Sequence, residues 1–193
     1  MKSLSEMTVE ELWELFPIVI SPYNPQWLDD YRTEKDIIVN CAGVNNVARI
    51  SHIGSTAVPG LTAKPTVDIL LEIHDDTDTD ALKHALERNG YIFERQPNKP
   101  APHMMFMKGY TQTGFAEKVY HLHVRYLGDW DEFYFRDYLV SHPSEAQRYG
   151  ELKKELKEKY EHDRDGYTAA KSEFIAEAVR KSRKESIVDY GVR

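Results

Sequence analysis

The chain has 193 residues, of which 30% are charged, and a formal net charge of −7 with a pI of about 5.6. This length allows one domain, over residues 1–193, with a substantial core and no need for disulfides or a structural metal. The acidic balance argues against tight nonspecific binding to DNA or RNA, because such binding depends on basic side chains that neutralise phosphates. We therefore expect no nucleic acid partner.

The sequence also argues against a membrane or secreted protein. No run approaches the ~20 apolar residues that a membrane-spanning helix requires. The first 14 residues alternate acidic and apolar types, which is unlike a signal peptide. The single cysteine, Cys41, cannot form an internal disulfide, which favours a reducing compartment. We expect a cytoplasmic protein, and the sequence does not indicate its oligomeric state.

The N-terminal part predicts two helices and a short extended segment. Thr8 and Glu11 have the spacing of a capping box, which predicts a short helix within residues 1–16. Residues 17–21 resemble a brief strand between prolines. Apolar residues at helical spacing then predict a second helix over residues 26–42, which the following glycine ends.

The middle of the chain predicts strands, and the last third predicts helices with charged outer faces. Residues 96–102 read as a Pro-rich loop, and 109–114 as a hairpin turn or a longer loop. This order predicts an α+β fold, with a mixed sheet covered on one face by helices and a helical C-terminal third. The predicted strands are 47–53, 65–73, 91–94, 103–108 and 118–126, and the predicted helices are 76–89, 129–141, 143–160 and 167–184.

The candidate site begins after the first of these strands, at Gly54-Ser55-Thr56. Such small residues predict a tight turn whose backbone N–H groups and hydroxyls could contact a phosphate. The next strand contains Asp68, and a carboxylate in an apolar strand is costly unless it lies at a strand end, is paired or binds a metal. The alternative is an ordinary turn beside a structural aspartate. Together the two features favour a phosphorylated ligand and a divalent ion.

The segment that joins these two strands contains Pro59-Gly60, which has the composition of a type II turn and would bring Asp68 back towards Gly54. Lys64, just before the second strand, could reach a phosphate or could be an ordinary surface lysine. Position 70 shares a strand face with Asp68 and is close enough for a second carboxylate to share its metal. That position is Leu70, so the strand lacks a two-carboxylate site.

His121 and His123 alternate onto one face of the strand predicted over 118–126. Such a pair could hold zinc, manganese or iron, contact a phosphate, or act as an acid or base near neutral pH. The alternative is two half-buried histidines with hydrogen-bond partners. His52, beside the Gly-Ser turn, could line the site or serve only in packing.

Three residues of the helical last third are further candidates for the pocket wall. Arg136 could bind phosphate through its several donors. Its neighbour Asp137 is adjacent on a predicted helix, so no ion pair between the two is expected. Tyr167 and Lys171 are one helical turn apart and could complete the pocket. An ordinary solvent-exposed helix face is the alternative for all three.

Five separated motifs, in the expected order, resemble the GrpB family. The resemblance covers roughly residues 19–184. It implies a nucleotidyltransferase-like fold related to the domain fused to some dephospho-CoA kinases, and it brings no settled substrate. The motifs are His52–Gly60, Ala63–Asp68, His121–Val124, Phe135–Leu139 and Tyr167–Lys171, preceded by Tyr23–Trp27.

The resemblance also implies which carboxylates a nucleotidyltransferase would need. In that superfamily a Gly-Ser turn precedes a strand with two carboxylates that hold Mg²⁺, and a later strand supplies a third that helps to activate the acceptor hydroxyl. Only Asp68 of the three carboxylates is matched here. Leu70 replaces the second, and His121 or His123 stands where we expect the third. These departures argue against standard two-metal nucleotidyl transfer.

Three functions remain open from the sequence. A nucleotidyltransferase-like enzyme would hold phosphates at residues 54–56 and Mg²⁺ or Mn²⁺ at Asp68, alone or with His121 or His123, while Lys64 and Arg136 would neutralise developing charge. A nucleotide- or coenzyme-binding module would use the same pocket without chemistry, as Leu70 suggests. A hydrolase would use Asp68 and both strand histidines to hold a transition metal.

Overall fold

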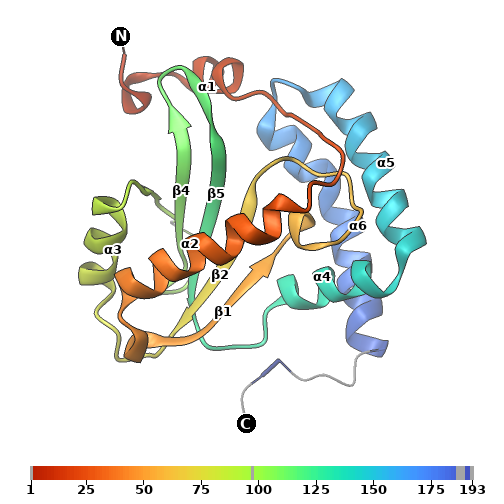
Figure 1. Cartoon of the computed structure of the whole chain (residues 1–193). Coiled ribbons are helices and arrows are strands. Elements are labelled where there is room, and N and C mark those ends of the chain that lie inside the picture. The colour runs from red at the N-terminus through yellow and green to blue at the C-terminus, as the bar shows by residue number, and fades with distance from the viewer. Residues whose placement is uncertain (1, 97, 186–189, 192–193) are drawn as a thin grey trace.

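The computed structural model describes residues 2–96, 98–185 and 190–191, so residue 97 of the predicted loop 96–102 lies outside the described residues. Figure 1 shows a mixed sheet crossed by α2, with α4, α5 and α6 grouped at one side. The helices are α1 (Val9–Leu15), α2 (Gln26–Ala42), α3 (Thr79–Arg88), α4 (Asp131–Ser141), α5 (Pro143–Tyr160) and α6 (Arg164–Glu185), and the strands are β1 (Val47–Ile53), β2 (Val67–Ile73), β3 (Ile92–Glu94), β4 (Met104–Thr111) and β5 (Gly114–Tyr126).

The sheet has the strand order β1-β2-β5-β4-β3. Strands β2 and β5 are parallel, and the other neighbouring pairs are antiparallel. The register places Asp68 opposite His121 and Leu70 opposite His123. The predicted α+β fold with a mixed sheet and a helical C-terminal third is therefore confirmed.

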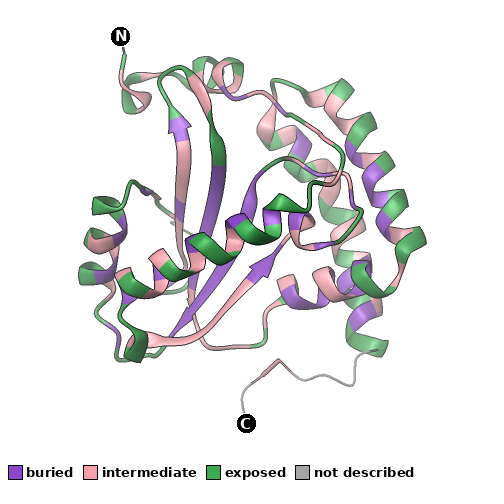
Figure 2. Cartoon of the chain, in the orientation of Figure 1, coloured by how far each residue is buried: buried purple, intermediate pink, exposed green. Residues whose placement is uncertain are grey.

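The alternation of side chains along β2 decides which face carries chemistry. Val67, Ile69, Leu71 and Ile73 are buried in the main core, together with side chains of α2 and α3. Asp68 and the other intervening residues point to the opposite face, because successive strand side chains alternate. Figure 2 shows the buried residues along β2 and the largely exposed outer side of α2. One sheet face is thus closed by α2 and α3, and the other faces the candidate site.

The C-terminal helices form a second core that fixes the loop after β1. Val58 and Leu61 of that loop pack with Leu139 of α4, Tyr149 of α5 and Ala178 of α6. Burying each large side chain contributes about 1.5–3 kcal/mol, so this cluster holds the loop firmly against the three helices. Among the helices that the structure describes, none has the length and apolar composition needed to cross a bilayer.

Several predicted boundaries need correction. The predicted strand at 17–21 is wrong: in this segment only an isolated bridge forms, between Ser21 and Ala63. The predicted helix at 76–89 begins instead at Thr79, because the Asp78 side chain accepts the N–H groups of Asp80 and Ala81 and caps it.

Two other local predictions are settled by the structure. The capping box of Thr8 and Glu11 is confirmed by both reciprocal hydrogen bonds, although the helix it begins, Val9–Leu15, is preceded by a separate short 3₁₀ turn, Leu4–Glu6. The segment 109–114 is a hairpin, since β4 continues to Thr111 and β5 already begins at Gly114. Both strands are therefore longer than predicted.

Candidate functional site

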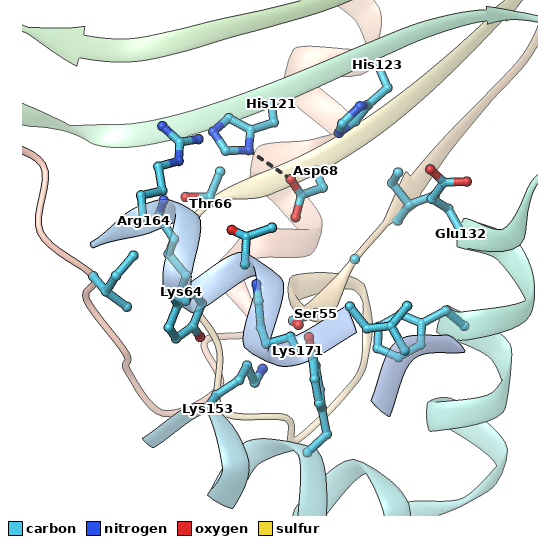
Figure 3. Close-up of a pocket in the computed structure, with 18 of the residues that line it drawn as sticks. Ser55, Lys64, Thr66, Asp68, His121, His123, Glu132, Lys153, Arg164 and Lys171 are labelled. Carbon is cyan, nitrogen blue, oxygen red and sulfur yellow. Dashed lines mark ion pairs between the residues drawn. The ribbon is translucent and has the colours of Figure 1, made fainter. Parts of the chain in front are cut away.

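A pocket of about 510 Å³ lies between the open face of the sheet, the turn after β1 and the C-terminal helices. Figure 3 shows its side chains converging from the sheet and from several helices. This volume falls within the usual range for sites that bind small molecules. Eight of the ten predicted site residues line it: Gly54, Ser55, Lys64, Asp68, His121, His123, Tyr167 and Lys171.

The turn after β1 brings Gly54 against Asp68, as predicted. Gly54 has a φ of 70°, and a Cβ at this position would lie 2.5 Å from Oδ2 of Asp68. Further along, Gly60 has a φ of 77°, and the N–H of Leu61 donates to the carbonyl of Val58 at 3.2 Å. These are features of the predicted type II turn. Glycine is thus required at residue 54 both for the backbone angle and for the approach of the carboxylate.

Asp68 is the first member of a hydrogen-bonded chain. Its Oδ1 lies 3.2 Å from Nδ1 of His121, and Nε2 of His121 lies 2.8 Å from the hydroxyl of Tyr110. Burial raises the pKa of Asp68, but the His121 hydrogen bond and nearby positive charges outweigh it, and the pKa lies below its ordinary value. Burial lowers the pKa of His121 although Asp68 opposes this change. At neutral pH the pair is therefore a carboxylate beside a neutral imidazole that donates from Nδ1.

The pocket also has an acidic side, which α4 supplies. Glu132 accepts a hydrogen bond from Nη1 of Arg125 at 2.9 Å, and Asp131 lies 2.7 Å from Nη2 of Arg183. His123 lies near this side, and burial lowers its pKa. Both acids are thus already compensated by arginines, which leaves Asp68 as the pocket carboxylate without an arginine or lysine partner within 4.0 Å among the described residues.

Four basic side chains line the pocket, and we call them the cationic cluster. None has a carboxylate within 4.0 Å among the residues that the structure describes, and each instead lies over an aromatic ring. Figure 3 shows them around the same cavity as Asp68. The pairs, with the distance from the cation to the ring centre, are Lys64 over Phe115 (5.6 Å), Lys153 over Tyr149 (4.6 Å), Arg164 over Tyr110 (5.9 Å) and Lys171 over Tyr167 (4.4 Å).

The lysines of the cationic cluster titrate far below an ordinary lysine. Burial, with repulsion from neighbouring cations, lowers the pKa of Lys64 and Lys153 to about 7 and that of Lys171 to about 8. Lys153 is only 2% exposed, and its Nζ donates to the carbonyl of Thr62. Near neutral pH these amines are therefore only partly charged, and a bound anion would favour their protonated form.

Two predicted residues lie outside the pocket lining. Thr56 is buried, where its hydroxyl donates to the carbonyl of Thr66 at 3.1 Å and contacts His52 at 3.0 Å. Arg136 donates to the carbonyl of His52 at 3.1 Å and to Oδ1 of Asp137 at 2.6 Å. The expectation that adjacent Arg136 and Asp137 do not pair is wrong, because the long arginine side chain reaches the neighbouring carboxylate.

His52 serves in packing. Its ring stacks on Tyr31 with the ring centres 4.9 Å apart, and the side chain is buried. Burial lowers the pKa of His52 to about 4 although Asp68 opposes this change. A neutral, stacked imidazole supports the β1 strand end and does not line the pocket.

The residues at Asp68 do not match a metal centre in this arrangement. Both ring nitrogens of His121 already have partners, Asp68 and Tyr110. Leu70 is fully buried with Ile53 and Phe133, so nothing polar stands where a second carboxylate would be needed. Over the described part of the chain, no group of three His, Cys, Asp or Glu side chains is placed to hold a metal ion. A site formed by Asp68, His121 and His123 would require these side chains to rearrange.

Sequence reasoning missed half of the cationic cluster. Lys153 and Arg164 lie on helices that are rich in lysine, arginine and glutamate, and Lys153 is followed by Lys154, which is exposed. No local signal separates these two lysines. Tyr149, one turn before Lys153, gives a weak hint, because an aromatic residue marks the inward side of such a helix.

The chain belongs to the GrpB family, whose model, described as GrpB protein, matches residues 17–181. A UPF0157 protein of Pseudomonas aeruginosa is 38% identical over 160 residues, 82% of this chain and 65% of the relative. The glutamate-rich protein GrpB of Alkalihalophilus pseudofirmus is 31% identical over 168 residues, 85% of this chain and 95% of the relative. The crystal structure of conserved protein GrpB from Enterococcus faecalis superposes with a TM-score of 0.76 at 26% identity, over 86% of this chain and 98% of that chain.

The predicted GrpB resemblance is thus confirmed. The chain spans 65% of the length of the Pseudomonas relative and 51% of that of a UPF0157 protein of Bacillus subtilis. The family match and the superposed GrpB structure therefore agree with the fold described above.

Proposed function

We propose that this GrpB-family chain binds a nucleotide or another phosphorylated small molecule in the pocket beside Asp68. The observation that carries this proposal is the cationic cluster, whose members line one cavity without carboxylate partners among the described residues. Clustered desolvated cations repel one another, and a bound polyanion would remove that cost. Charge-assisted hydrogen bonds from lysine and arginine are strong contacts for phosphate oxygens.

Two roles are compatible with such binding. In a nucleotidyltransferase-like enzyme, an acceptor hydroxyl would attack a nucleotide phosphorus, pyrophosphate would leave, and Asp68 would take the hydroxyl proton. Asp68 is ionised at neutral pH and hydrogen-bonded to His121, so it could accept a proton, although its lowered pKa makes it a weak base. A non-catalytic binding module is favoured by one observation, the buried Leu70 at the second carboxylate position.

A thermal-shift panel would test the proposal. Nucleoside triphosphates and coenzyme A precursors are compared with their unphosphorylated counterparts, nucleosides and pantetheine, each with and without Mg²⁺ or Mn²⁺. A ligand at 100 times its dissociation constant stabilises the folded state by about 2.7 kcal/mol. We expect stabilisation by phosphorylated compounds alone. No stabilisation by any of them would contradict the proposal, and release of pyrophosphate with an added acceptor would distinguish the enzyme from the binding module.

A further inference from the structure

We infer that the pocket takes its phosphorylated ligand as a free polyanion, neutralised by the cationic cluster instead of by a divalent metal ion. This inference rests on the proposed function, because it describes how the same pocket holds the same class of ligand. The inference narrows the class of ligand from any phosphorylated small molecule to a compound with a diphosphate or an equivalent pair of anionic groups.

Few groups around Asp68 are free to bind a metal ion. Asp68 lies against Gly54 on one side and 3.2 Å from Nδ1 of His121 on the other. The remaining nitrogen of His121 is hydrogen-bonded to Tyr110. Leu70, on the same strand face as Asp68, is fully buried and apolar. A divalent ion at Asp68 would therefore find a single carboxylate, the smallest number that holds Mg²⁺ on nucleotide phosphates, and one oxygen of that carboxylate already accepts a hydrogen bond from His121.

The charge balance of the cavity favours an anionic ligand. The four cations of the cluster share the cavity with one carboxylate that has no arginine or lysine partner within 4.0 Å among the described residues, Asp68, so four positive charges against one negative charge leave an excess of three when all four are protonated. The acidic residues Asp131 and Glu132 do not reduce this excess, because Arg183 and Arg125 compensate them. A bound diphosphate would favour the protonated form of the lysines and would offset this excess without a metal.

The side chains of the cationic cluster are held in place around the cavity. Lys153, Arg164 and Lys171 come from α5 and α6, and Lys64 comes from the segment before β2, so the cluster surrounds the cavity from two directions. Each lysine lies over an aromatic ring, which leaves its N–H donors available. Lys153 uses one of its three donors on the Thr62 carbonyl, and this contact fixes the amine in place. Such fixed donors are preorganised for phosphate oxygens.

The test is calorimetric titration of the full chain with pyrophosphate, in EDTA and in excess Mg²⁺. We expect binding in EDTA, with Mg²⁺ adding nothing or weakening it, because the ion competes for the same phosphate oxygens. Lys153→Met and Lys171→Met should each weaken binding about 10- to 100-fold, the size of one lost charge-assisted hydrogen bond. Lys154→Met, at the exposed neighbouring position on α5, is the matched control and should leave the affinity unchanged.

Asp68→Asn separates the two ways of neutralising the ligand. Without a metal, this variant removes a negative charge from the cavity and should bind pyrophosphate as tightly as the wild type or more tightly. Binding that requires Mg²⁺ and disappears in Asp68→Asn would overturn the inference while leaving the proposed function intact. No binding of pyrophosphate in either condition would contradict both. Thermal unfolding of each variant confirms that it is folded.

Discussion

Gly54→Ala tests whether the close approach of the turn to Asp68 builds the site. Gly54 has a φ of 70° and a ψ of −168°, a region that only glycine adopts readily, so alanine there should cost about 1–3 kcal/mol. The new Cβ would also lie 2.5 Å from Oδ2 of Asp68 and 3.1 Å from its Cγ. Asp68 must therefore shift from its present position, and a disrupted hydrogen bond to His121 should add about 1–3 kcal/mol.

Gly60→Ala is the matched control for this substitution. Gly60 also has a positive φ, of 77°, but a Cβ there meets no atom within 4 Å. Gly60→Ala should therefore lower the free energy of unfolding only through the unfavourable backbone angle, by about 1–2 kcal/mol. Urea unfolding of both variants measures the difference, and Gly54→Ala should be the less stable by the Asp68 contribution.

A second comparison locates the cause of that difference. In an Asp68→Ala background the carboxylate oxygen 2.5 Å from the new Cβ is gone, while the Cβ of residue 68, 3.1 Å away, remains, so Gly54→Ala should cost less than in the wild type and come closer to Gly60→Ala. Equal destabilisation by Gly54→Ala and Gly60→Ala in the wild-type background would refute the reasoning. Pyrophosphate binding, measured in parallel, should weaken in Gly54→Ala and stay unchanged in Gly60→Ala.

Three further predictions concern charge. Arg49→Leu leaves the fully buried Glu72 without its ion-pair partner and should reduce the free energy of unfolding by about 3–5 kcal/mol. Arg32→Ala, at an exposed ion pair on α2, is the control and should change it by less than about 1 kcal/mol. Similar losses of stability in urea for the two variants would contradict this prediction. The pocket lysines have folded pKa values of about 7 to 8 against an ordinary 10.5, so the unfolded chain binds more protons between these values. The free energy of unfolding of the ligand-free protein should therefore rise from pH 7 to 9.5, and a fall over this range would contradict the lowered values. Pyrophosphate affinity should fall over the same range as the lysines lose protons, and calorimetry in buffers of different ionisation enthalpy should show proton uptake on binding; an affinity that does not change with pH would count against the lysines as ligands.

The sequence predicts those parts of the site that have a local signal. Glycine and proline at the turn and an aspartate in an apolar strand are unusual in their positions, and they correctly indicate that Gly54 meets Asp68. The alternation of His121 and His123 correctly places both histidines on the pocket side of β5. Each of these features depends on the geometry of a few neighbouring residues, so it can be recognised in the sequence.

The rest of the site depends on packing between elements far apart in the chain. Lys153 and Lys154 are identical neighbours, and only the contact of α5 with the loop at Leu61 and Thr62 turns one inward and the other to solvent. Arg136 has a phosphate-binding side chain, but the packing of α4 against β1 directs it to the His52 carbonyl. The predicted strand at 17–21 is wrong for a related reason. Within this segment only Ser21 forms a β-bridge, with Ala63.

The central claim is that the cavity beside Asp68 holds a phosphorylated ligand. The most direct measurement is the electron density of crystals grown with pyrophosphate in the presence of EDTA. We expect a diphosphate in the cavity, with oxygens within hydrogen-bond distance of Lys64, Lys153 and Lys171. Density for pyrophosphate only at another place on the protein, with this cavity filled by water, would contradict it.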